Sequence, residues 1–179
     1  MTHIRWRAGD LDRLLDEGHA GLVGAMVTML AELGWEVLPE VTFSEWGERG
    51  SVDILAWHAA TRTLLVVEVK TEIVSAEETL RRHDVKARLG PAMGVARFGA
   101  RPRAVAKLLV VAEGSTNRRR VERLAPVLDV SYPLRSDRVR AWLSEPDGTM
   151  AGLLVASVPR AAGRPAPRRV RRTRLGRPT

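Results

Sequence analysis

Two carboxylates and a lysine stand close together in a stretch of the chain that is otherwise largely apolar. Asp53 lies in the run Ser-Val-Asp-Ile-Leu-Ala-Trp, and Glu68 and Lys70 lie in the run Leu-Leu-Val-Val-Glu-Val-Lys. An unpaired charge inside an apolar strand is costly, so Glu68 needs a positive partner. Lys70 follows two residues later and shares the face of Glu68 in a strand. One lysine against two carboxylates still leaves negative charge, and we expect a cation to compensate it.

The two segments that carry these residues are predicted to be the strands of an antiparallel hairpin, over residues 51–59 and 63–71. If the turn is centred between Ala60 and Thr61, Asp53 faces Glu68 directly, with Cβ atoms about 5 Å apart. A slip of one residue would move one side chain to the other face of the sheet. The predicted site therefore depends on this register.

The type of cation follows from the available ligands. The sequence has no cysteine, which excludes thiolate metal sites and disulfides. Two carboxylates fit a hard divalent cation, Mg²⁺ or Mn²⁺. Such a cation lowers the pKa of a bound water and stabilises charge on a phosphoryl oxygen. A lysine beside it can orient or deprotonate the water, or hold the developing charge.

Asp53, fourteen intervening residues and then Glu68-Val69-Lys70 resemble the motif of the PD-(D/E)xK nuclease superfamily, whose fold is restriction-endonuclease-like. The resemblance covers roughly residues 10–113. It implies Mg²⁺-dependent (or Mn²⁺-dependent) hydrolysis of DNA by an endodeoxyribonuclease. Asp53 and Glu68 would be metal ligands and Lys70 the catalytic lysine. Val52 stands where the superfamily often has the proline of its motif.

A helix predicted over residues 10–34 precedes the motif, with apolar residues at steps of three and four. His19 falls on its inner face and resembles the histidine that RecB-type nucleases place in a comparable helix, which implies a third metal ligand. Asp16 and Glu17 are alternatives, although helical spacing points them elsewhere. A core or surface histidine is an equally good interpretation of His19. In the strand predicted over 35–44, Glu40 could approach the site, but its alternation with apolar neighbours favours a solvated face.

The rest of the pattern predicts an α/β fold: a restriction-endonuclease-like mixed sheet flanked by helices. Ser75 and Glu78 form a capping-box pattern at the start of a helix. We expect one domain over residues 1–159 and a disordered, basic tail over 160–179. The remaining elements are a helix over 75–89, an ambiguous stretch over 90–102, a strand over 105–112, a helix over 116–127 and strands over 138–143 and 150–157.

The net charge of +8 is unevenly distributed. Residues 160–179 hold eight arginines and no acidic residue, so the rest of the chain has 21 basic and 21 acidic residues. Such a tail would release counterions on binding DNA or RNA. Arginine outnumbers lysine 26 to 3 over the whole chain, so a compositional preference explains the tail equally well. The candidate phosphate contacts are Arg81, Arg82 and Lys86 on the helix after the motif, and Arg168, Arg169, Arg171 and Arg172 in the tail.

Three hypotheses for the function remain open at this point. The first is a metal-dependent deoxyribonuclease, the second a non-catalytic nucleic-acid-binding or regulatory protein that retains the nuclease fold, and the third an interaction module whose tail binds an acidic partner. Target selection would need a homodimer, a partner DNA-binding protein or structure-specific recognition. The N-terminus has no signal-peptide pattern, and the longest apolar run is about half the length of a membrane span. We therefore expect a cytoplasmic protein with no membrane partner.

Overall fold

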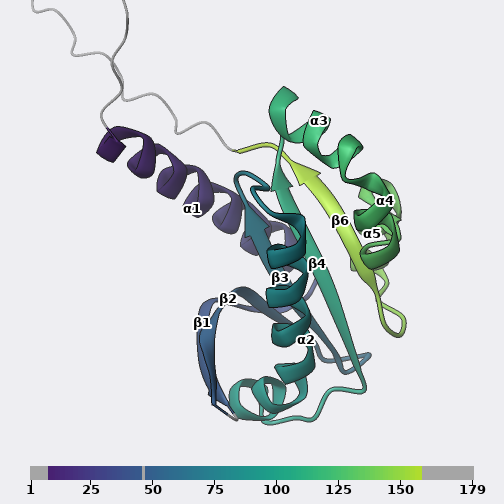
Figure 1. The fold of residues 1–179 in the computed structure, drawn as a ribbon. Helices are drawn as coiled ribbons and strands as arrows, with labels where there is room; N and C mark the ends of the chain where they lie inside the picture. The colour runs from purple at the N-terminus through teal and green to yellow at the C-terminus, as the bar shows by residue number, and fades with distance from the viewer. Residues whose placement is uncertain (1–7, 46, 159–179) are drawn as a thin grey trace, which may run out of the picture.

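The computed structural model describes residues 8–45 and 47–158. Within them, helices cover both faces of a six-stranded mixed sheet (Figure 1). This confirms the predicted α/β class with a mixed, helix-flanked sheet. The strands are β1 (Glu36–Glu45), β2 (Glu48–His58), β3 (Thr63–Lys70), β4 (Ala104–Ala112), β5 (Leu134–Arg135) and β6 (Ala151–Ala156). The helices are α1 (Ala8–Glu32), α2 (Ala76–Phe98), α3 (Ser115–Arg123), α4 (Ala125–Ser131) and α5 (Ser136–Ser144).

The strand order in the sheet is β1-β2-β3-β4-β6-β5. The first three strands are antiparallel neighbours, and β3, β4, β6 and β5 run parallel to one another. A parallel pair needs a crossover connection, and α2 supplies the one between β3 and β4. The first six elements follow in the predicted order.

The side chains of β3 divide the interior into two layers. Leu65, Val67 and Val69 pack with α1 and α5 on one face, whereas Leu64 and Val66 pack with α2 on the other. Figure 1 shows α2 in front of the central strands and α1 running behind them. Because side chains alternate along a strand, Glu68 continues the α2 face.

The predicted hairpin register is confirmed over the paired residues, but the ladder ends before the expected Asp53–Glu68 pair. Ile54 pairs with Val67 and His58 with Thr63, so the turn is centred between Ala60 and Thr61. The turn holds Arg62 with a φ of 54°, an unusual conformation for a residue with a side chain.

The helix after the motif is longer than predicted. It runs through Pro91 and ends at Gly99, whose φ of 66° is left-handed. Gly90 and Gly94 lie on its packed face, where an added Cβ would be 3.0 Å from the side chains of Val105 and Pro102. This close packing outweighs the local cost of a proline inside the helix.

Two predictions for the C-terminal half are wrong. Residues 138–143 form part of α5 and not a strand, because Val139 and Leu143, four residues apart, are both fully buried. A run this short fits the strand and helix periods alike. The helix predicted over 116–127 is two helices, with Leu124 between them and Pro126 in the first turn of α4.

Among the described residues, no helix combines the length and apolar character that a membrane span requires. The arginine-rich residues 160–179, with Arg168, Arg169, Arg171 and Arg172, lie outside the described residues.

Candidate metal centre

The centre lies where β2 separates from β3. Their ladder begins at His58 and Thr63 and ends at Ile54 and Val67, whereas β1 and β2 stay paired as far as Glu45 and Glu48. The next residue of β2 is Asp53, and its Oδ2 accepts a hydrogen bond of 2.6 Å from the backbone N–H of Val69. At this fork, where β2 and β3 separate, the Asp53 side chain therefore takes the place of a backbone carbonyl as the hydrogen-bond acceptor for Val69. Figure 1 shows the β1–β2 hairpin curling away from the central strands.

Glu40 lies on β1 and faces Asp53, on the side of β2 that is away from β3. The flanking pairs are Pro39 with Ile54 and Val41 with Val52. Glu40 has a φ of 52°, in the left-handed region that is unfavourable for a residue with a side chain. This breaks the alternation of the hairpin: Val52 and Leu55 both pack on the α2 face, three positions apart. The irregularity lets Asp53 reach the α1 side of the sheet.

His19 completes a cluster with these two carboxylates. Its Nε2 is 3.8 Å from Glu40 Oε1 and 3.9 Å from Asp53 Oδ1. One ligand atom from each residue lies within 4.8 Å of the others. Helix α1 passes close to the end of β3, since a Cβ at Gly18 would be 3.4 Å from Thr71 Cγ2. The two carboxylates suit Mg²⁺ or Mn²⁺, and the imidazole also suits a softer cation such as Zn²⁺. The donor set is therefore compatible with the predicted cations but does not select them.

Glu68 is held by two lysines. Its side chain is buried, with Lys70 Nζ 2.7 Å from Oε1 and Lys86 Nζ 2.5 Å from Oε2. Lys86 comes from α2, and its side chain is only 12% exposed. Lys70 therefore comes from the same strand as Glu68, whereas Lys86 is brought to this carboxylate by the packing of α2 on β3.

Burial and charge shift the pKa values of the two acids in opposite directions. Burial, followed by the charge of Glu68, raises the pKa of Asp53, although the Val69 N–H, Lys86 and His19 act against the rise. Burial alone would also raise the pKa of Glu68, but the charges and hydrogen bonds of Lys86 and Lys70 outweigh it and lower that pKa. Glu68 is therefore ionised, and of the two carboxylates Asp53 is the one whose ionised form is disfavoured in the folded protein.

The cluster differs from the ligand set predicted from sequence. We expected Asp53, Glu68 and His19; the described residues bring His19 and Asp53 together with Glu40, and place both oxygens of Glu68 against lysines. The Glu40 side chain is 61% exposed, in keeping with the solvated face we favoured, yet its carboxylate lies at the cluster. Pro39, which disfavours a regular strand interior, was the sequence signal for this irregular position.

Lys86 is placed differently from its neighbours in sequence. Arg81 and Arg82 are exposed and both contact Glu78, whereas Lys86 lies on the packed face of α2. That face was visible as a run of helical spacing through Thr79, His83 and Lys86 towards the buried Leu89 and Met93. Of the alternatives to His19 on α1, both Asp16 and Glu17 are exposed.

The sequence analysis did not identify His83, which is fully buried on the packed face of α2. Its Nε2 lies 3.0 Å from the carbonyl oxygen of Val66, and its Nδ1 lies 2.8 Å from the Tyr132 hydroxyl. A carbonyl can only accept, so Nε2 carries the proton and Nδ1 accepts from Tyr132. Burial lowers the pKa of His83 to about 4. The residue therefore joins α2, β3 and α4 as a neutral imidazole.

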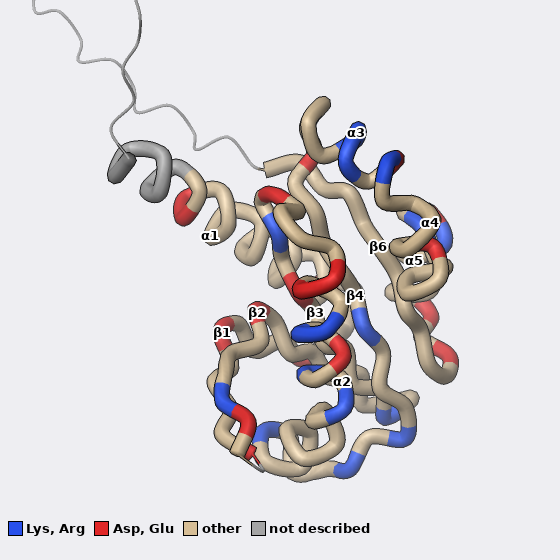
Figure 2. The backbone as a smooth tube through the Cα atoms, in the orientation of Figure 1, with Lys and Arg blue, Asp and Glu red and all other residues tan. Residues whose placement is uncertain are grey.

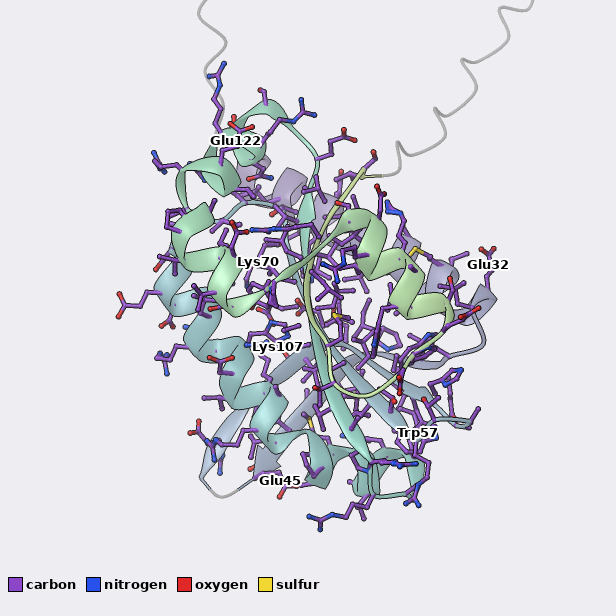
Figure 3. The ribbon with its side chains drawn as sticks, turned by 90° about the vertical axis from the view of Figure 1, so that its right-hand side faces the viewer. Glu32, Glu45, Trp57, Lys70, Lys107 and Glu122 are labelled. Atoms are coloured by element: carbon purple, nitrogen blue, oxygen red, sulfur yellow. The ribbon has the colours of Figure 1, made fainter. Side chains whose placement is uncertain are left out.

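Lys107 on β4 lies on the same side of the sheet. Its Nζ is 2.5 Å from Asp84 Oδ1 and 5.1 Å from the centre of the Tyr132 ring. Figure 3 shows Lys70 and Lys107 between α2 and the strands. All three lysines of the chain thus lie on the α2 side of the sheet, Lys86 on the helix itself and Lys70 and Lys107 on the strands that it covers.

No protein-family model matches this sequence, and no curated protein matches it either. A functional assignment therefore rests on the residues around Asp53 and Glu68.

Proposed function

We propose that the chain is a divalent-cation-dependent nuclease that hydrolyses phosphodiester bonds of DNA on a restriction-endonuclease-like fold. The observation that carries this proposal is the convergence of His19, Glu40 and Asp53 beside the Glu68–Lys70 pair at the fork of the sheet. A nuclease of this type needs a cation next to a lysine, and these five residues supply both requirements.

His19, Glu40 and Asp53 would hold the cation. A cation bound there would lower the pKa of a coordinated water and would stabilise negative charge on a phosphoryl oxygen. Lys70, whose side chain is 33% exposed and whose Nζ is held by Glu68 Oε1, would stabilise the charge that develops on the phosphate. Lys86 neutralises the second oxygen of Glu68, so that Glu68 orients the lysines.

The strained backbone of Glu40 gives independent support. A left-handed φ costs of the order of 1–3 kcal/mol, and such strain concentrates at functional sites. The raised pKa of Asp53 supports the proposal in the same way, because burial and the charge of Glu68 outweigh the Val69 N–H, Lys86 and His19, and a bound cation would favour the ionised form.

The second candidate is a non-catalytic nucleic-acid-binding or regulatory protein. One observation favours it: both oxygens of Glu68 are occupied by lysines, so Glu68 has no oxygen free of a cationic partner to offer a metal. This candidate predicts nucleic-acid binding without metal-dependent cleavage.

Cleavage of a DNA panel separates the two candidates. Supercoiled, linear, single-stranded and branched DNA would be incubated with the full chain and Mg²⁺ or Mn²⁺. We expect cleavage that EDTA abolishes, with a loss of about 10²–10³-fold in Glu40→Gln and in Lys70→Met. Nicking of closed circles would identify an endonuclease.

Glu36→Gln is the matched control, because Glu36 is an exposed glutamate on the same strand as Glu40. It should cleave like the wild type, and circular dichroism should show all variants folded. Equal cleavage by Glu40→Gln and wild type would contradict the assigned roles. Absence of cleavage together with absence of Mn²⁺ binding in calorimetry would favour the second candidate.

A further inference from the structure

A groove of about 430 Å³ lies between the tip of the β1–β2 hairpin and α2. The hairpin contributes Phe43, Glu48 and Arg49, and the helix contributes Arg81, Arg82 and Lys86. In Figure 2, basic positions mark both walls, the hairpin at the lower left and α2 beside it. The groove is therefore lined by cations from two separate elements.

The basic side chains that line this groove differ in whether they already have an acidic partner. Arg81 and Arg82 both contact Glu78, and Lys86 contacts Glu68. Glu48, the acidic residue of the lining, lies 3.6 Å from Arg88. The Arg49 side chain is exposed and forms no hydrogen bond or ion pair with any described residue, although its backbone belongs to the β1–β2 ladder. Its guanidinium is available for a bidentate contact with a phosphate.

Lys86 connects the groove to the candidate metal centre. Its stem lines the groove, and its Nζ contacts Glu68 at the fork of the sheet. The lining of the groove includes none of His19, Glu40 and Asp53, so Lys86 is the residue that links the two regions. The ring of Phe43 lies against Gly50 at the groove wall, where a Cβ would be only 3.0 Å away, so it offers an apolar surface to a base.

We propose that this groove binds the backbone of a single nucleic-acid strand next to the metal centre, with Arg49 contacting a phosphate. The volume matches ligand pockets of roughly 300–1,000 Å³, which is room for one nucleotide but not for a duplex. The inference rests on the proposed function for the class of substrate. Its test measures binding in the absence of cleavage.

The test is the salt dependence of oligonucleotide binding by the full chain. Fluorescence anisotropy in EDTA would follow a labelled single-stranded DNA, the same sequence as RNA, and the duplex, between 50 and 200 mM salt. Each phosphate contact on a single strand contributes about 0.7 to the slope of log K against log salt. We expect Arg49→Met to lose about that amount with both single strands and to change duplex binding less, whereas Arg49→Lys retains the slope.

Arg138→Met is the matched control, because Arg138 is an exposed arginine on α5, across the sheet from α2. It should keep the wild-type slope. Equal slopes for Arg49→Met and Arg138→Met would overturn the proposal, as would an equal loss with the duplex or a loss confined to one of the two sugars. A nuclease that cleaves but shows no Arg49 effect would refute the groove alone; an Arg49 effect without cleavage would refute the nuclease alone.

Discussion

At the scale of single residues, the choice of lysine over arginine is informative. The chain has 26 arginines and three lysines, and two of these lysines share the carboxylate of Glu68. An ammonium is a compact point charge that fits one carboxylate oxygen, whereas a guanidinium is a planar fork that needs more room. The limited space beside the Glu68 carboxylate therefore suits lysine better than arginine at positions 70 and 86.

Asp53 is expected to destabilise the metal-free protein. Its folded-state pKa is raised above the unfolded value of 3.8, so the cost is absent below that pH and fully present once Asp53 ionises in the folded chain. Asp53→Asn removes the charge and keeps an oxygen to accept from the Val69 N–H. We expect a higher melting temperature at pH 7, with each kcal/mol relieved adding roughly 2–4 °C.

Mn²⁺ provides the control for this prediction. Ion binding to the folded state should raise the melting temperature of the wild type and leave Asp53→Asn nearly unchanged. If Asp53→Asn melts below the metal-free wild type, the carboxylate is a stabilising group and our account of its pKa is wrong.

At the scale of elements, α2 has two faces with separate roles. Its packed face carries His83 and Lys86 against β3, and its exposed face carries Arg81 and Arg82 towards the groove. The Tyr132 hydroxyl reaches His83 from the end of α4. One buried imidazole therefore fixes the helix that positions Lys86.

This imidazole is expected to make stability depend on pH. The folded-state pKa of His83 is about 4 and the unfolded value is 6.5, so only the unfolded chain binds the proton between these pH values. Its contribution is complete above pH 6.5 and falls by about 3 kcal/mol as the pH is lowered to 4. Lys86, Lys107 and Glu68 are the charged groups around it. Urea denaturation from pH 4 to 7.5 measures the loss.

His83→Gln should be less stable than the wild type at pH 7 but should show a smaller loss between pH 6.5 and 4. His58→Gln is the comparison, because the half-buried His58 lies at the end of β2 and contacts Thr61. Parallel pH profiles for the wild type and His83→Gln would show that His83 is not the group responsible.

At the scale of the whole molecule, the net positive charge belongs to one end of the sequence. Residues 160–179 carry eight arginines, while the rest of the chain is balanced. The cations that face the candidate centre are instead few and paired, as Lys70 and Lys86 illustrate. Overall affinity for a polyanion and chemistry at the centre should therefore be separable.

Deletion of residues 160–179 tests this separation. If the arginines bind phosphates, the slope of log K against log salt for duplex DNA should fall by several units, at about 0.9 for each phosphate that is no longer neutralised. The affinity for Mn²⁺ in calorimetry should not change. An unchanged slope would assign the arginines to a compositional preference, and a weakened Mn²⁺ affinity would show that the two regions act together.

The sequence determined much of the central hairpin. Alternation and turn length were enough to predict the hairpin register and to place Lys70 beside Glu68, because the pairing of two strands joined by a short turn is a local property. They did not predict that the ladder ends before Asp53 can pair with Glu68. The order of elements as far as β4 followed from the same periodicities. The association of His19 with Asp53 remained one of several alternatives.

Tertiary structure alone decided the partners of these residues. Lys86 reaches Glu68 because α2 crosses back over β3, and Glu40 joins His19 because a left-handed residue interrupts β1. Packing also carried α2 through Pro91 and made 138–143 a helix, since close packing outweighs weak local preferences. Interactions between segments far apart in sequence leave little trace in residue spacing, so the ligand set could be recognised only in the folded chain.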